Sequence, residues 1–559
     1  MLLRHARADG GARPALRIVQ PPEAGSAADA DLSRRAFVLL LAMAVFLGIV
    51  VRAMFVLASD FPLGDGGLFY QMVRDLQHAG YALPSTTAYN DAGIPYAYPP
   101  LAMYAAGLLD SLTPLSLFDV FRVLPLLGSA LTILAVVALA RDLLSSRMAV
   151  AAAVFCFAMV PRSFTWLIMG GGLTRSFGMA FAILTIHAAF LLYTRRERRF
   201  AVSATLFASL ALLSHIEMTW FAAFSSAIFF LAYGRHRTGV IASIGVCAGV
   251  AALTSPWWAT VMAYHGIEPF IAAMNARDVS STNPLIMFID FKFTSEMLFP
   301  VSAALGLLGS ILCVAERRFV LPGWLLATAL LDARAFGTVG SVPLALLAAV
   351  AFTDIVWPIV TRATPLRLRS LAGTLEVRSV LPPATVFPAV VIGSLMLYTL
   401  LTAMVSTPRT LTGMSVDERA AMSWSAANTP AGSRFLVVTA DQWALDRTSE
   451  WLPALTGRVS VTTPQGYEWT RDRGFGERLA AYNELQNCAN DGSTCIDTWA
   501  SERAVGFDYL YIPKLAPRST LNVEDEAECC GALRASLRGD ARYETVFDGP
   551  GATIFRRRS

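Results

Sequence analysis

Apolar runs of roughly 17 to 25 residues recur along this chain from Phe37 to about Ala403, with short polar breaks between them. Each run is long enough to cross about 30 Å of hydrocarbon as a helix. Because 55% of the 559 residues are hydrophobic and only 15% are charged, most of the chain belongs in lipid. The sequence therefore predicts an α-class protein, a polytopic helical membrane protein.

Basic clusters between the runs orient the predicted spans, since short cytoplasmic loops carry an excess of arginine and lysine. The clusters lie at 34–35, 141–147, 195–199, 235–237, 317–318 and 362–378. All of them reach the cytoplasm if the chain crosses about eleven times, at 36–58, 119–140, 148–167, 175–194, 200–214, 218–234, 238–262, 297–315, 319–333, 341–360 and 383–405. Two long segments, 59–118 and 263–296, are then outside the cytoplasm. The apolar piece 101–109 is too short to span, and we expect an interfacial helix or a re-entrant hairpin there.

The composition changes at both ends of the membrane domain, 36–405. Residues 1–35 are rich in Ala, Gly and Arg without apolar periodicity, which indicates a disordered cytoplasmic tail. Residues 406–559 have the mixed composition of a water-soluble domain, which the span count places outside the cytoplasm. Predicted strands in this domain, together with a capping box at Ser415 and Glu418, give an α/β class. The expected location is the inner (plasma) membrane, and a net charge of +4 is too small to indicate nucleic acid.

The seven cysteines fall into two groups. Three lie in apolar spans, where cysteine serves as a small hydrophobic residue: Cys156, Cys247 and Cys313. The other four, Cys488, Cys495, Cys529 and Cys530, lie in the domain placed outside, where disulfides persist. A bridge between Cys488 and Cys495 is the first choice. The rival is a zinc site, which the absence of a CxxC pair and of any histidine after His265 disfavours.

The first outside segment contains an acidic glycine loop and a proline box. Residues 64–70 read Gly-Asp-Gly-Gly-Leu-Phe-Tyr, and residues 96–101 read Tyr-Ala-Tyr-Pro-Pro-Leu. An acid soon after the first span, an aromatic residue a little further on and a Tyr-Pro-Pro-Leu box resemble the GT-C class of membrane glycosyltransferases. That class includes protein O-mannosyltransferases, the lipid A aminoarabinose transferase and the catalytic subunit of oligosaccharyltransferase. At residue level the resemblance is confined mainly to 60–104, so it implies a superfamily and no particular substrate.

The resemblance implies inverting transfer of a hexosyl or pentosyl group from a polyprenyl-phosphate donor to an extracytoplasmic glycan, lipid or protein acceptor. Asp65 matches the first-loop acid of such enzymes, which acts as general base or binds a divalent metal. A carboxylate beside the lipid can accept the proton of the acceptor as the glycosyl bond forms. The alternative role for Asp65 is an N-cap or turn acid before the helix expected from Leu68.

Cations are expected near Asp65, because the leaving polyprenyl phosphate develops negative charge. Arg175 follows a glycine-rich outside turn, and Arg277 and Arg334 lie in other segments placed outside. The alternative for Arg175 is a snorkelling interfacial side chain. Arg277 and Arg334 alternatively form local ion pairs with their acidic neighbours, Asp278 and Asp332.

Three further residues are candidates for the same site. His215 and Glu217 lie between apolar stretches, where ionisable side chains are functional suspects. Glu217 is a catalytic candidate and, together with Asp65, a tentative ligand for Mg²⁺ or Mn²⁺. Tyr98 either lines the site or anchors the chain at the headgroups.

The C-terminal segment supplies an acceptor-binding candidate. Trp443 and the stretches 450–453 and 465–469 place aromatic rings beside carboxylates and amides, a combination that suits sugars but also ordinary core packing. Two other functions compete with glycosyl transfer: a transporter or flippase of lipid-linked sugars, and a non-catalytic envelope assembly protein. The sequence has no obvious internal repeat, and the large outside domain favours an enzyme.

Overall fold

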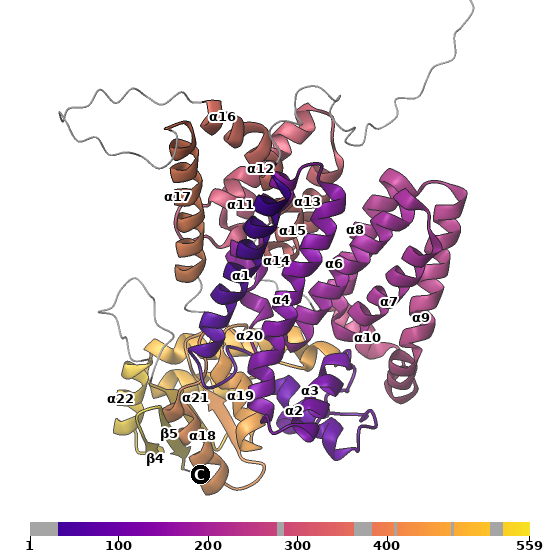
Figure 1. Cartoon of the computed structure of the whole chain (residues 1–559). Coiled ribbons are helices and arrows are strands. Elements are labelled where there is room, and N and C mark those ends of the chain that lie inside the picture. Colours follow the sequence, from indigo (N-terminus) through magenta and orange to yellow (C-terminus); the bar gives the residue numbers. More distant parts are fainter. Residues whose placement is uncertain are drawn as a thin grey trace, which may run out of the picture.

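The computed structural model describes residues 32–276, 284–362, 383–406, 411–470, 474–514 and 529–558. A bundle of long helices carries a smaller α/β domain at one end (Figure 1). The first helices are α1 (Arg34–Leu57), α2 (Gly67–His78), α3 (Leu101–Leu112), α4 (Leu117–Leu143), α5 (Arg147–Met159), α6 (Gly172–Arg195), α7 (Arg198–Ser214), α8 (Ile216–Phe229) and α9 (Arg237–His265). They are followed by α10 (Glu268–Asn275), α11 (Pro284–Ile289), α12 (Val301–Ala315), α13 (Val320–Leu331), α14 (Phe336–Val339), α15 (Ser341–Ala351), α16 (Trp357–Arg362) and α17 (Pro383–Val405). The predicted tail 1–35 lies almost entirely outside the described residues.

Helices occupy each of the eleven segments predicted to span the membrane, which confirms the polytopic helical class. Among the described residues, seven helices are long and apolar enough to cross a bilayer, or eight when the bent pair Arg147–Met159 and Pro161–Leu167 counts as one span. The other three predicted spans form α7, α12 and α13, which are 17, 15 and 12 residues long. A helix needs about 20 residues to cross the hydrocarbon upright, so these three are short for that role.

Helix α6 is central to the bundle, and its first turn leads into the candidate site. It packs against α4, α7 and α8. Small residues allow the close approach: a Cβ added to Gly128 would lie 2.8 Å from the Cβ of Ser176, and one added to Gly178 would lie 2.7 Å from the Cβ of His215. These contacts fix the start of α6 relative to α4 and to the turn before α8.

The C-terminal domain contains a five-stranded mixed sheet, as the α/β prediction required. Its elements are α18 (Val416–Asn428), β1 (Arg434–Val437), α19 (Arg447–Thr456), β2 (Val459–Ser460), α20 (Gly474–Asn487), α21 (Ser493–Glu502), β3 (Tyr509–Pro513), α22 (Gly531–Gly539), β4 (Tyr543–Asp548) and β5 (Ala552–Arg557). The strand order is β2-β1-β3-β5-β4, with β1 parallel to β2 and β3, and β5 antiparallel to β3 and β4. Every residue of β3 is buried, because the strand lies at the centre of the sheet. The predicted capping box at Ser415 and Glu418 is present.

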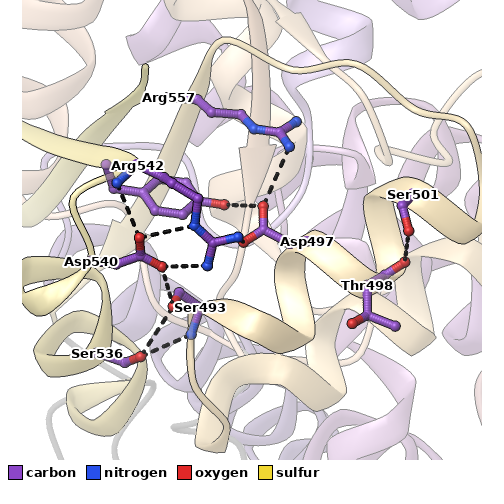
Figure 2. Close-up of polar contacts among 9 residues, drawn as sticks. Ser493, Asp497, Thr498, Ser501, Ser536, Asp540, Arg542 and Arg557 are labelled. Carbon is purple, nitrogen blue, oxygen red and sulfur yellow. Dashed lines mark hydrogen bonds and ion pairs between the residues drawn. The ribbon is translucent and has the colours of Figure 1, made fainter. Parts of the chain in front are cut away.

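A polar network fastens the β4–β5 hairpin to α21 (Figure 2). The guanidinium of Arg542 lies 2.8 Å from Asp497 and 2.6 Å from Asp540, and the hydroxyl of Tyr543 donates to Asp497. Ser493 donates a further hydrogen bond to Asp540. The hydrogen bonds from Arg542 hold the pKa of Asp540 below its ordinary value. Because these charges compensate one another, we assign the network a structural role.

The four cysteines of this domain form two disulfides. Cys488 is bonded to Cys495, the pairing that the sequence favoured. Cys529 is bonded to its neighbour Cys530, a pairing that the sequence analysis did not propose. Cys156, Cys247 and Cys313 are free and lie in α5, α9 and α12.

Candidate functional site

The loop between α1 and α2 lies where the bundle meets the C-terminal domain. The amide of Gly170, in the turn before α6, donates to the carbonyl of Leu63 at 2.7 Å. On the other side, Leu63 forms an antiparallel bridge with Gly413, and the amide of Gly64 donates to the carbonyl of Thr412. The loop is therefore held by backbone contacts from both parts of the protein.

Asp65 lies in this loop and faces the start of α6. Its Oδ1 accepts a hydrogen bond from the amide of Gly171 at 2.9 Å, and its Oδ2 forms an ion pair with Arg175. The side chain is 20% exposed. The N-cap of α2 is Gly66, whose left-handed backbone (φ 134°) is one that glycine adopts readily. Asp65 makes no capping bond to α2, so the N-cap alternative is wrong.

Arg175 projects from the first turn of α6 and is tied to the same turn. Its Nε donates to the carbonyl of Gly171, and its guanidinium lies over the ring of Trp166, 5.4 Å from the centroid. The side chain is 15% exposed, so Arg175 is a part-buried cation paired with Asp65. A Cβ at Gly171 would lie 2.5 Å from Oδ2 of Asp65, so the pair needs a glycine here.

The Tyr-Pro-Pro-Leu box brings Tyr98 to the same place. Its hydroxyl lies 3.4 Å from Oγ1 of Thr174, and its ring packs edge-on against His215 at 5.9 Å and Trp469 at 5.5 Å. Burial raises the pKa of Tyr98 to about 12, so its hydroxyl remains a donor at neutral pH. His215 caps α8, where its Nδ1 accepts from the amide of Met218. Tyr98 therefore lies beside the first turn of α6, between His215 and Trp469.

Glu217 and Arg334 form a second ion pair near this wall. Nε of Arg334 lies 3.6 Å from Oε1 of Glu217. The expected local alternative, a pair between Arg334 and Asp332, is wrong, because Oδ1 of Asp332 instead caps the turn at the amide of Ala335. Arg277 and Asp278, the other predicted pair, lie outside the described residues.

The two carboxylates predicted to bind a metal each lie beside an arginine. In the ranges that the structure describes, no group of three His, Cys, Asp or Glu side chains is placed to hold an ion. Asp65 and Glu217, the tentative Mg²⁺ or Mn²⁺ ligands, each face an arginine instead. The predicted ligand set is therefore incomplete, and Asp65 stands as a carboxylate beside a cation.

Glu450 of α19 is a site carboxylate that sequence reasoning did not single out by itself. Its Oε1 accepts from the amide of Gly66 at 2.9 Å, and the side chain is buried. Burial and the nearby charge of Asp65 raise the pKa of Glu450 to about 8. The neighbouring Trp451 donates from Nε1 to the carbonyl of Gly64. The sequence placed 450–453 in an acceptor-binding candidate, but only the fold brings it to the Asp65 loop.

The raised pKa of Glu450 predicts a pH-dependent stability. At pH values between 4.5, the ordinary pKa of a glutamate, and about 8, Glu450 of the folded protein holds a proton that the unfolded chain has released. Stability therefore falls as pH rises through this window and levels off above it. We expect the melting temperature in detergent to fall from pH 5 to pH 8, and Glu450→Gln to reduce this fall by about 5 °C. Parallel melting curves for the two proteins would contradict the expectation.

The arrangement combines a part-exposed carboxylate, a bound cation and a phenolic donor. Asp65 can accept a proton from a nucleophile, and Arg175 can stabilise an anionic oxygen. Tyr98 can donate a hydrogen bond to a sugar or phosphate oxygen. Such a site suits displacement of a phosphate leaving group without a covalent enzyme intermediate.

Comparisons with known structures identify the fold of this chain. No family model matches the chain, and no curated protein matches it. The apo oligosaccharyltransferase of Archaeoglobus fulgidus superposes with a TM-score of 0.54 at 13% identity, covering 86% of this chain and 70% of that chain. The aminoarabinose transferase ArnT of Cupriavidus metallidurans, bound to undecaprenyl phosphate, superposes with a TM-score of 0.52 at 12% identity. The match covers 93% of this chain and 97% of that chain.

A third similar structure is the arabinofuranosyltransferase AftD from Mycobacteria, with a TM-score of 0.54 at 18% identity over 95% of this chain and 40% of that one. The Archaeoglobus enzyme, named AglB, was also solved with an inhibitory peptide and a dolichol-phosphate, and in another structure with zinc and sulfate. The chain has the fold of these GT-C membrane glycosyltransferases, as its first-loop residues implied.

Proposed function

We propose that this protein transfers a glycosyl group from a polyprenyl-phosphate donor to an extracytoplasmic acceptor, with inversion at the sugar carbon. The observation that carries the proposal is the Asp65 carboxylate, presented on a glycine loop between bundle and C-terminal domain and held by Gly171 and Arg175. Support comes from neighbours that were solved with dolichol-phosphate and undecaprenyl phosphate.

Asp65 acts as the general base in this reaction. The acceptor oxygen or nitrogen attacks the anomeric carbon, its proton passes to a carboxylate oxygen of Asp65, and the bond from the sugar to the phosphate oxygen breaks. The electron pair of that bond leaves with the polyprenyl phosphate. Arg175 stabilises the negative charge that develops on it, at a part-buried position where a cation acts more strongly than in water.

The loop 59–118 and the domain 406–559 lie on one side of the membrane, and we assign that side to the exterior of the plasma membrane. Contact between Leu63 and Gly413 supports a common side for both. The exterior follows from the basic clusters, which this orientation places in the cytoplasm.

The C-terminal domain covers the reaction site and contributes to acceptor binding. Trp469 supports this role, because its ring packs against Tyr98. Trp443 is part-buried and its ring packs edge-on against Phe475 within its own domain. The acceptor is a glycan, a lipid or a protein segment that reaches the junction of the two domains.

A transfer assay with purified protein tests the function. The protein is reconstituted in liposomes with radiolabelled mannosyl, glucosyl and arabinosyl polyprenyl phosphates, and release of free polyprenyl phosphate is followed with and without added acceptors. We expect cleavage of at least one donor. Movement of an intact donor across the bilayer without cleavage would identify a flippase, and neither event with any donor would point to a non-catalytic assembly protein.

Arg175 is expected to matter more to the transfer rate than Arg334. Arg175 pairs with Asp65 at the reaction centre, whereas Arg334 is 60% exposed and pairs with Glu217. We expect Arg175→Gln to lower kcat by about a hundred-fold, the usual cost of losing one stabiliser of developing charge, and Arg334→Gln by about ten-fold or less. Steady-state rates of polyprenyl phosphate release measure both. If Arg334→Gln lowered kcat more than Arg175→Gln, the leaving phosphate would be assigned to a position beside Arg334.

A further inference from the structure

The N-terminus of α2 has no cap from its own segment. The N-cap residue is Gly66, which has no side chain, and Asp65 is turned toward Gly171 and Arg175. The first backbone amides of a helix still need acceptors, particularly when they are buried. Gly66 and Leu68 are buried, so their amides need a partner within the protein.

Glu450 supplies that partner from the other domain. Its Oε1 accepts from the amide of Gly66, and the amide of Leu68 also faces its carboxyl group. Residues 66 and 450 are 384 positions apart. The contact thus performs, between two domains, the task that a capping box performs within one segment.

Other contacts hold α19 against this end of α2. Trp451 donates to the carbonyl of Gly64, and Tyr89 donates to the carbonyl of Glu450 at 2.7 Å. At Gly67 the backbones approach so closely that a Cβ would lie 2.5 Å from the carbonyl oxygen of Glu450. These contacts hold the backbone of Glu450 and the ring of Trp451 against the start of α2.

We propose that Glu450 is a positioning residue: by capping α2 from the C-terminal domain, it leaves Asp65 free to face Gly171 and Arg175. Asp65 directly precedes the N-cap Gly66, so without Glu450 its own carboxylate becomes a candidate acceptor for the open amides of α2. An uncapped helix end would draw Asp65 toward Gly66 and Leu68 and away from Arg175. The C-terminal domain thereby controls whether the base is in place.

This inference rests on the proposed function for its kinetic consequence only, so its test has two readouts. The first is hydrogen exchange of peptides covering residues 62–72 in the full-length protein. The second is kcat and KM for donor cleavage. Hydrogen exchange reports the cap of α2 whether or not the protein transfers sugar. Absence of transfer activity would therefore contradict the proposed function but not the capping role of Glu450.

Three variants separate capping from general damage. Glu450→Ala removes the acceptor, and we expect exchange of the 62–72 peptides to rise by about ten-fold and kcat to fall by a similar factor, with KM for the donor within about two-fold. Glu450→Gln retains an acceptor oxygen, so its exchange of the 62–72 peptides and its kcat should be close to those of the wild type. Gln486→Leu disturbs the same domain, where Gln486 accepts from the amides of Thr439 and Ala440, and should change neither.

Two results would overturn the inference. One is unchanged exchange at 62–72 in Glu450→Ala, which would mean that the amides of α2 do not depend on Glu450. The other is equal damage from Glu450→Gln and Glu450→Ala, which would assign the effect to the charge or proton of Glu450 and not to its acceptor oxygen.

Discussion

Replacing Asp65 with asparagine is expected to lower the rate of glycosyl transfer by about a thousand-fold, within the range that a general base contributes. Asparagine has the same shape, and its carbonyl oxygen can still accept from the amide of Gly171. It cannot take up the proton of the acceptor, and it removes the negative partner of Arg175. The initial rate of polyprenyl phosphate release measures the loss, and an unchanged melting temperature shows that the fold persists.

Asp60 provides a matched control on the same loop. It also pairs with an arginine, since Oδ2 lies 2.5 Å from Arg419, but its side chain is 67% exposed. We expect Asp60→Asn to retain transfer within about two-fold, because an exposed ion pair contributes little. Full activity in Asp65→Asn would assign the base to another carboxylate, with Glu217 or Glu450 next to be tested.

The helical framework could be predicted from sequence because it depends on local patterns. Apolar runs located the helices of the bundle, and the arginine clusters gave the predicted orientation of the spans. Lengths were less predictable. The run at 319–333 became a helix of only twelve residues, since it ends at Asp332, whose side chain caps the next turn.

The site was predictable only where its residues lie near a recognisable motif. Asp65 is marked by its glycine loop and Arg175 by the glycine-rich turn before it. The partner of Arg334 was missed, because adjacency favoured Asp332 whereas the fold brings Glu217 from another helix. Glu450 carries no local signal, since its acceptor role exists only after the C-terminal domain has packed on α2.

Gly171→Ala is expected to lower the transfer rate on the order of a thousand-fold without any change at Asp65 or Arg175, because it displaces base and cation together. The backbone of Gly171 is already right-handed, with φ −67°, so alanine brings no conformational strain. Its Cβ would lie 2.5 Å from Oδ2 and 2.7 Å from Cγ of Asp65, and closer still to the guanidinium of Arg175. The two side chains must separate to admit a methyl group.

The comparison with Gly245→Ala isolates this steric effect. Gly245 lies within α9, and a Cβ there would meet nothing within 4 Å, so its substitution should leave the rate unchanged. Overpacking at Gly171 also costs about 1–3 kcal/mol of stability, which a lower melting temperature would report. If Gly171→Ala melted at a lower temperature but transferred sugar at the wild-type rate, close contact between Asp65 and Arg175 would not be needed for catalysis. The base would then act without its cation, and the phosphate would have to be stabilised elsewhere.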